Sequence, residues 1–268
     1  MTMIAKNGQL HLACGDMDYI EFGSGEQPFV MLPGVGDGFK TVKGMAYPFA
    51  LLYHGLGKMF HVYAFSRREE LAPHMTTRDM AADLNEAMEA LGIRDAAVAG
   101  VSQGGMIAQW LAIDHPERVR KRVRIVTSSR PRQVLLDGIS RWLAMADRDD
   151  YKGIMLDTAE RSYSEKKLRS AKMSYGLLGT VGKPKSYERF RIQAESCVTH
   201  DAYEELGRIA CPTLVIGGEE DRIATGEASR EMAERIPDCT LKMYPGLSHG
   251  LYEEVPGFWE EVVGAFCL

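Results

Sequence analysis

Residues 96–105 read Ala-Ala-Val-Ala-Gly-Val-Ser-Gln-Gly-Gly, and residues 106–112 continue as Met-Ile-Ala-Gln-Trp-Leu-Ala. The first part is an apolar run typical of a buried strand, and the last part has the composition of a helix. Ser102 lies between them, so the pattern predicts a serine at a tight strand-to-helix turn. Residues without a Cβ suit the flanks of such a turn, and Gly100 and Gly104 supply them. The plainer alternative is a glycine-rich loop with an ordinary serine.

Strands and helices alternate over most of the rest of the chain. Residues 9–14 and 19–22 predict an antiparallel hairpin, and further strands are expected at 29–32, 59–65, 96–99, 123–126, 213–216 and 240–243. Helices are expected at 77–91, 104–113, 227–235 and 258–266. This order predicts an α/β fold, with a mostly parallel central sheet flanked by helices on both faces.

The alternation stops between about residues 129 and 206, where the sequence is helical in character and rich in aromatic and methionine side chains. We therefore expect a helical cap insertion at 129–206, within an α/β core made of 1–128 and 207–268. Open α/β sheets bind ligands at the carboxyl ends of their strands, where this cap would sit. Trp142 and Met145 of the cap, with Gly34 of the core, are expected to contact substrate.

Composition excludes several classes of function. The net charge of −5 over 268 residues disfavours nucleic-acid binding, which usually needs a basic surface. No run of about 18 apolar residues is present, so no membrane span is expected, and the N-terminus lacks an apolar targeting segment. The five cysteines, Cys14 among them, are scattered without a CxxC pair, which predicts neither a zinc site nor a disulfide framework and favours a reduced, cytoplasmic protein.

A serine hydroxyl needs a base within hydrogen-bond reach, and that base needs an orienting group. His249 is the best candidate for the base, because it lies in a loop between the 240–243 strand and the last helix. Asp221 is the preferred acid, since it follows the 213–216 strand after two glycines that let the chain turn back. Glu219 and Glu220 of the same loop are the alternatives.

Negative charge that develops on a substrate carbonyl oxygen needs preorganised donors. The N–H of Gln103, directly after the candidate nucleophile, is one candidate. The N–H of Val35, in the loop Leu-Pro-Gly-Val-Gly-Asp-Gly at 32–38, is the other. A phosphate cradle is the competing interpretation of this loop, but Phe39 occupies the position where the third glycine of such a motif is required.

Together these stretches resemble the α/β-hydrolase superfamily over nearly the whole chain. The resemblance rests on the Gly-Val-Ser-Gln-Gly turn, the 32–36 loop, the stretch from Cys211 to Asp221 and the Gly-Leu-Ser-His-Gly loop at 246–250. It implies Ser102 as nucleophile. Two departures are visible: Pro33 stands where many members have His, and Ser-Arg-Arg-Glu at 66–69 replaces the Asp-x-Arg-Gly turn of many members. Arg122 and Arg124 also occupy positions where apolar strand residues are expected.

The resemblance implies a serine hydrolase of small carboxylic esters, thioesters or lactones that acts through an acyl-serine, with no metal or organic cofactor. Cap aromatics and the apolar residues of 49–53 favour a small-molecule substrate with an apolar acyl or aryl group. An acyltransferase or a C–C bond hydrolase on the same triad remains an alternative, as does a non-catalytic small-ligand receptor. The sequence does not reveal the oligomeric state.

Overall fold

The computed structural model describes residues 4–13 and 15–268. These residues form an eight-stranded sheet in the order β1-β2-β4-β3-β5-β6-β7-β8. From β4 to β8 neighbouring strands run parallel, and β1 and β2 form an antiparallel extension at one edge. The predicted α/β sheet is confirmed. Its strands are β1 (Ile4–Leu12), β2 (Gly15–Gly23), β3 (Pro28–Leu32), β4 (His61–Phe65), β5 (Ala96–Val101), β6 (Val119–Ile125), β7 (Thr213–Gly218) and β8 (Cys239–Tyr244).

The structure can be compared with the expectations at the N-terminal hairpin and at β6. The predicted hairpin is β1 and β2, although Cys14, placed at the end of its first strand, lies outside the described residues. The prediction that β6 starts at residue 123 is wrong, because the strand begins at Val119. Its first half carries Arg120 and Lys121, whose long side chains donate to the backbone carbonyls of Cys267 and Phe266. The charged residues of this segment therefore hid the start of the strand from a prediction based on apolar runs.

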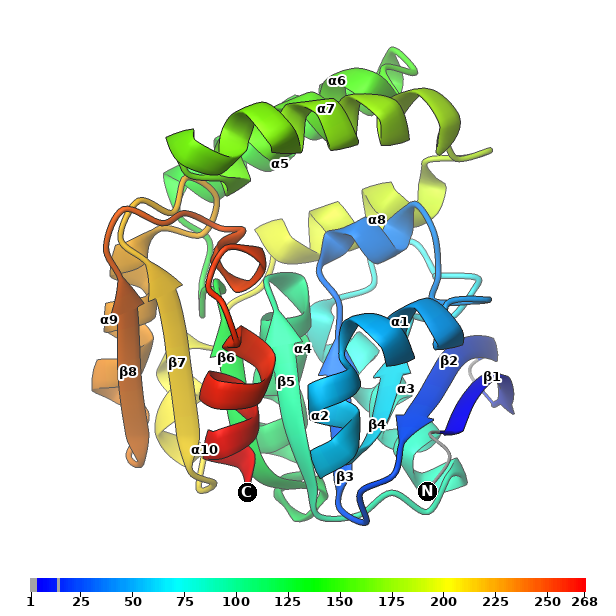
Figure 1. Cartoon of the computed structure of the whole chain (residues 1–268), viewed down its shortest axis with the longest axis vertical. Coiled ribbons are helices and arrows are strands. Elements are labelled where there is room, and N and C mark those ends of the chain that lie inside the picture. The colour runs from blue at the N-terminus through cyan, green and yellow to red at the C-terminus, as the bar shows by residue number, and fades with distance from the viewer. Residues whose placement is uncertain (1–3, 14) are drawn as a thin grey trace.

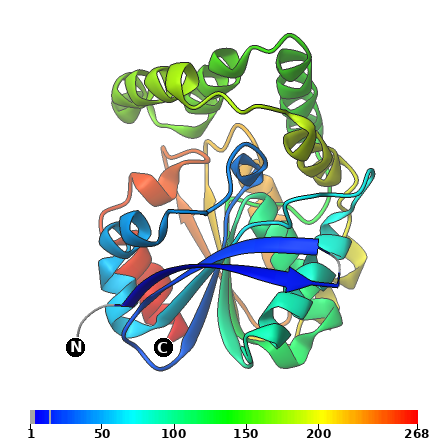
Figure 2. The ribbon, with the colours of Figure 1, turned by 90° about the vertical axis from the view of Figure 1, so that its right-hand side faces the viewer.

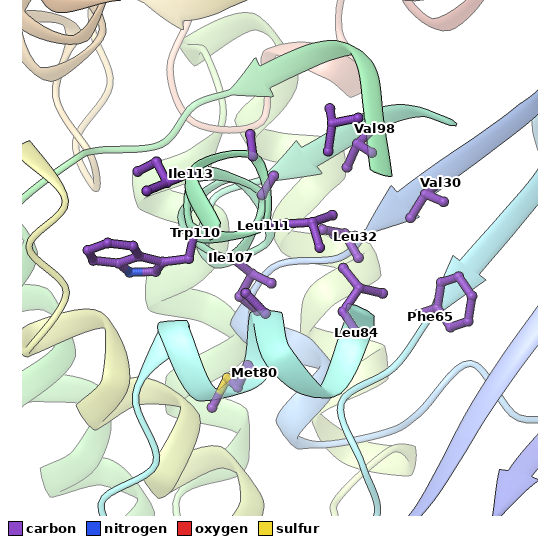
Figure 3. Packing of buried hydrophobic residues seen from close by; sticks show 14 of the residues in the cluster. Val30, Leu32, Phe65, Met80, Leu84, Val98, Ile107, Trp110, Leu111 and Ile113 are labelled. Atoms are coloured by element: carbon purple, nitrogen blue, oxygen red, sulfur yellow. The ribbon is translucent and has the colours of Figure 1, made fainter. Parts of the chain in front are cut away.

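Helices cover both faces of the sheet (Figure 1). Side chains alternate along each strand, so Val30 and Val98 face one helical layer while Phe29 and Ala97 face the other. The first layer contains α3, α4 and α9, and Figure 3 shows α3 and α4 packed against β3 and β5. The opposite layer contains α1, α2 and the C-terminal segment. Their bounds are α1 (Ala46–Leu52), α2 (His54–Met59), α3 (Thr77–Ala90), α4 (Gln103–Asp114), α9 (Gly226–Arg235) and a π-helical turn (Phe258–Gly264) continued by α10 (Ala265–Cys267).

Four helices lie between β6 and β7 and cross the carboxyl ends of the strands (Figures 1 and 2). They are α5 (Gln133–Asp147), α6 (Tyr151–Ser162), α7 (Glu165–Val181) and α8 (Glu188–Val198). No strand lies among the residues described between β6 and β7. The helix α8 packs on η1, a short 3-10 helix after β3 (Val35–Gly38). Another 3-10 helix (Tyr203–Arg208) then returns the chain to the core, where Leu206 is buried.

Among the described residues, none of the helices combines the length and the apolar character that crossing a bilayer requires. The described cysteines are free thiols, namely Cys197, Cys211, Cys239 and Cys267.

Candidate active site

Ser102 sits at the sharp turn between β5 and α4. Its backbone has φ 52° and ψ −119°, a conformation that costs a residue with a side chain of the order of 1–3 kcal/mol. The surroundings hold it there, because its N–H donates to Ile125 O at 2.9 Å and its carbonyl accepts from Thr127 Oγ1 at 2.7 Å. Glycine is required on both flanks: a Cβ on Gly100 would lie 2.3 Å from Gly104 O, and one on Gly104 would lie 2.2 Å from Leu32 O.

Asp221 and His249 come together at the carboxyl ends of β7 and β8. Nδ1 of His249 lies 2.9 Å from Oδ2 and 3.1 Å from Oδ1 of Asp221, and both side chains are buried. Burial alone would raise the pKa of Asp221. The facing His249 and the N–H groups of Ile223 and Ala224 outweigh it and lower that pKa below its ordinary value. The carboxylate is therefore the acceptor, and Nδ1 carries the proton.

Of the two alternative acids, Glu219 is engaged elsewhere. Glu219 forms an ion pair with Arg230 of α9, at 2.6 Å from Oε2, so it does not compete with Asp221 for His249. Cys197 is fully buried on α8, and burial raises the pKa of its thiol to about 12. A thiol that is not ionised at neutral pH is a poor nucleophile.

The two expected oxyanion donors lie at the starts of two helical segments. Val35 is the first residue of η1 and Gln103 the first of α4, where N–H groups have no intrahelical acceptor. Gly34 lies directly against the serine, since a Cβ on Gly34 would be 3.4 Å from Ser102 Cβ and 3.9 Å from its Oγ. The side chain of Gln103 is buried and donates to Gln193 O at 2.7 Å, so only its backbone is available to a ligand.

A cavity of about 760 Å³ lies between the sheet edge and the cap. The cavity is lined by several of the candidate site residues, namely Ser102, His249, Gly34, Val35 and Trp142. Most of the other lining side chains are apolar, and they include Val42, Met45, Phe49, Val101, Ile154, Met155, Leu178, Phe190 and Ile223. The cavity can therefore take a predominantly apolar small molecule.

Met145 and Gln103, two residues expected to contact substrate, are not part of the lining of this cavity. Gln103 follows Ser102 directly in the chain, whereas Met145 lies on the cap. It packs half-buried on α5 against the hydrophobic cluster of α5, α6 and α8, because the turn of the helix that faces the cavity presents Trp142 instead. Of the apolar residues at 49–53, Phe49 lines the cavity whereas Leu51 and Leu52 are exposed.

Polar side chains mark one end of the cavity, where Glu253, Tyr175 and Ser162 are part of the lining. The hydroxyl of Tyr163 donates to Glu253 Oε2 at 2.5 Å and lies 3.1 Å from that of Tyr175. Residues 4–13 and 15–268 contain no group of three or more His, Cys, Asp or Glu side chains placed so that they could hold a metal ion.

Sequence reasoning missed a buried polar network behind the 32–38 loop. Arg67 is 4% exposed, and its Nη2 donates to Pro33 O at 2.6 Å and to Gln103 Oε1 at 2.9 Å. Asp37 Oδ2 accepts from Arg67 N at 3.0 Å and from Arg189 Nη2 at 2.9 Å. The signal that could have found this network is the unusual stretch at 66–69.

Comparison with known proteins places this geometry in a family. Residues 28–256 match the family model described as "alpha/beta hydrolase fold". A Caulobacter sp. (strain K31) protein with the provisional name carbamate hydrolase RutD is 28% identical over 193 residues, 71% of this chain and 72% of its own length. The non-heme chloroperoxidase of Streptomyces lividans is 30% identical over 193 residues, 66% of this chain and 68% of its own.

Among solved structures, MGS-M2 is an alpha/beta hydrolase enzyme from a Medee basin deep-sea metagenome library. It superposes with a TM-score of 0.85 at 21% identity, over 97% of this chain and 96% of its own. The likeness of architecture agrees with the match of the family model over most of the chain. The chain belongs to the α/β-hydrolase fold family.

Proposed function

We propose that this protein is a serine hydrolase that cleaves a small carboxylic ester, thioester or lactone through an acyl-serine intermediate. One observation carries the proposal: Ser102 and His249 line a single cavity, and His249 is held from behind by the buried carboxylate of Asp221. A serine at a strained turn, a histidine with its Nδ1 proton fixed and two helix-start N–H groups are the parts that acyl transfer needs.

In the proposed reaction Ser102 Oγ attacks the acyl carbon, and His249 Nε2 takes the hydroxyl proton. The Asp221 carboxylate keeps the Nδ1 tautomer and stabilises the imidazolium that forms. The N–H groups of Val35 and Gln103 hold the negative carbonyl oxygen, each worth about 3–4 kcal/mol in comparable sites. His249 then protonates the leaving group, and in the second half it activates the water that releases the acid and restores Ser102.

The apolar lining of the cavity supports an acyl or aryl group as the part of the substrate that is bound next to Ser102. The provisional name of the relative RutD, carbamate hydrolase, agrees with hydrolysis as the reaction class. The choice of ester, thioester or lactone as the substrate rests on the site chemistry of this chain.

The direct test is hydrolysis of p-nitrophenyl esters of increasing acyl length by the wild-type chain and by Ser102→Ala. We expect turnover by the wild type, with an optimum at an acyl length that fills the cavity. We expect the variant to lose at least about 10³-fold in kcat while circular dichroism and the melting temperature show a folded protein.

Turnover that persists unchanged in Ser102→Ala would refute the acyl-serine mechanism. A folded wild type that binds such esters without any turnover would instead support the receptor reading of this scaffold. Added alcohols or thiols that divert the acyl group into a new ester would identify an acyltransferase.

A further inference from the structure

The buried network behind the 32–38 loop joins the two segments that carry the proposed oxyanion donors. A single nitrogen, Nη2 of Arg67, donates both to Pro33 O and to Gln103 Oε1. Pro33 lies two residues before Val35, and Gln103 itself supplies the second donor. Arg67, which lies in the loop after β4, thus links the loop after β3 to the start of α4.

The segment η1 is fixed at its other end by a carboxylate. Asp37 Oδ2 accepts from the backbone N–H of Arg67 at 3.0 Å and from Arg189 Nη2 of α8 at 2.9 Å. Val35 lies between these two anchored points. Because peptide planes are rigid, holding the carbonyl of Pro33 and the side chain of Asp37 restricts where the N–H of Val35 can point.

We propose that Arg67 is a positioning residue of the oxyanion hole, which sets the Val35 and Gln103 N–H groups at a common point above Ser102. This inference rests on the proposed function, because an oxyanion hole has meaning only for acyl transfer. The side chain of Arg67 is 4% exposed and its Nη2 is engaged by Pro33 O and Gln103 Oε1, so we assign it no direct contact with substrate. A guanidinium suits this role since it stays charged when buried and offers several donors in a rigid plane.

The test uses the full chain with Arg67→Met, which keeps side-chain length but has no donor. Two quantities are measured: kcat and KM for the best p-nitrophenyl ester, and the inhibition constant of a trifluoromethyl ketone of the same acyl length. Ser102 Oγ adds to this ketone, the carbonyl electron pair moves to oxygen, and the hydroxyl proton passes to His249. The adduct oxygen then occupies the oxyanion position.

Misaligned donors weaken transition-state binding more than substrate binding. We therefore expect Arg67→Met to lower kcat about 10- to 100-fold, with KM within about threefold of wild type. The inhibition constant should rise by the same factor as kcat falls. Arg67→Lys, which keeps a charge and donors on a differently shaped side chain, should recover part of kcat.

Arg124→Met is the matched control, because Arg124 is also buried but donates its hydrogen bond to the sulfur of Met232 rather than to either loop. We expect its kcat and its inhibition constant to stay within about twofold of wild type. The inference is overturned if Arg67→Met keeps wild-type kcat, or if kcat falls while the inhibition constant does not change.

Where Arg67→Met does not fold, Arg67→Lys alone decides, and wild-type kcat in that variant overturns the inference. Failure of the proposed function would look different, since Ser102→Ala would then retain hydrolysis. Loss of activity in Ser102→Ala with normal Arg67 variants removes only the positioning role.

Discussion

Arg67 at the carboxyl edge of the sheet and Arg124 in the middle of β6 are both almost completely buried, but they have different surroundings. Arg67 Nη2 donates to a main-chain carbonyl and to an amide oxygen, and the neighbouring Arg189 is paired with Asp37. The polar partner of Arg124 is the sulfur of Met232 at 3.1 Å. Within the part of the chain that the structure describes, each arginine has two nitrogens without a hydrogen-bond acceptor, Nε and Nη1 in Arg67 and Nε and Nη2 in Arg124. The two differ in the remaining nitrogen, which donates to two oxygens in Arg67 and to a sulfur in Arg124.

Burial lowers the pKa of both guanidinium groups, but the neighbouring charges differ, since Asp37 opposes this effect at Arg67 whereas Arg122 adds to it at Arg124. Arg122, on the same face of β6, is also fully buried. Burial, followed by repulsion from Arg122, lowers the pKa of Arg124 well below its usual range. His200, adjacent to this pair, has its pKa lowered to about 3 by burial and by the charge of Arg124. Burying a cation costs little free energy only where oxygen acceptors form hydrogen bonds with it. The group of Arg122, Arg124 and His200, which we call the β6 layer, therefore carries an electrostatic penalty in the folded state.

The two buried histidines give the largest contrast. His249 has a carboxylate behind it, whereas His200 has Thr77 Oγ1 at 2.7 Å and Gln109 Oε1 at 3.3 Å. Replacing the carboxylate by Asp221→Asn would stabilise the wrong tautomer of His249, so we expect ester hydrolysis to fall about 10³- to 10⁴-fold. Glu219→Gln is the control, measured by kcat on the same ester. A larger loss in Glu219→Gln would transfer the orienting role to Glu219.

His200 is expected to govern acid stability rather than activity. Its folded-state pKa of about 3 lies below the ordinary 6.5, so between these pH values the unfolded chain binds a proton that the folded chain does not. Stability from this residue is complete above pH 6.5 and falls as pH decreases toward 3, by about 4–5 kcal/mol in total at 1.36 kcal/mol per pKa unit.

Urea unfolding measured at steps from pH 7 to pH 4, for the wild type and for His200→Gln, checks this expectation. Glutamine has no proton to gain, so the variant should show a shallower fall in the free energy of unfolding. Parallel curves for the two proteins would mean that His200 does not carry the acid sensitivity.

Arg67→Met is expected to destabilise the fold. It leaves the buried oxygens of Pro33 and Gln103 without their donor, and each orphaned acceptor costs about 1–3 kcal/mol. We expect the free energy of unfolding to fall by about 2–6 kcal/mol in urea titrations at pH 7. No change in stability would argue that these contacts are not formed in solution.

Arg124→Met should have the opposite sign and the smaller size. Removing a buried charge that lacks oxygen acceptors, while filling its volume with an apolar side chain, should raise the free energy of unfolding by about 1–3 kcal/mol. The melting temperature should rise accordingly. A destabilised Arg124→Met would show that the buried nitrogens of the β6 layer have hydrogen-bond partners in solution, and it would remove the contrast with Arg67.

The sequence predicted the parts of the site that follow directly from apolar strands. The loops of Ser102, Asp221 and His249 each come after a strand of a parallel sheet, and such strands bring their carboxyl ends to one edge. Val35 follows the same logic after β3. Local pattern and topology together were therefore enough to bring these residues to one place.

The remaining features depend on contacts between distant residues. The hydrogen-bond partners of Arg67 lie 34 and 36 positions away in the sequence. The stretch at 66–69 was therefore visible as a departure from the family pattern, but the contacts that Arg67 makes were not. Val119–Arg122 is a strand despite its charges, because its long side chains bond to the C-terminal carbonyls and to the interior. Met145 shares α5 with Trp142, but side-chain direction on a cap helix depends on how that helix packs.

Covalent labelling tests most directly whether Ser102 is the nucleophile of an acyl-transfer site. The wild type, Ser102→Ala and Ser248→Ala would be incubated with a p-nitrophenyl alkylphosphonate and examined by intact mass and peptide mapping. In the wild type and in Ser248→Ala we expect one adduct, on Ser102, with release of one p-nitrophenolate and loss of ester hydrolysis. In Ser102→Ala we expect no adduct. An adduct on another residue, or a labelled Ser102→Ala that loses hydrolysis in step with its labelling, would contradict the role of Ser102 as nucleophile.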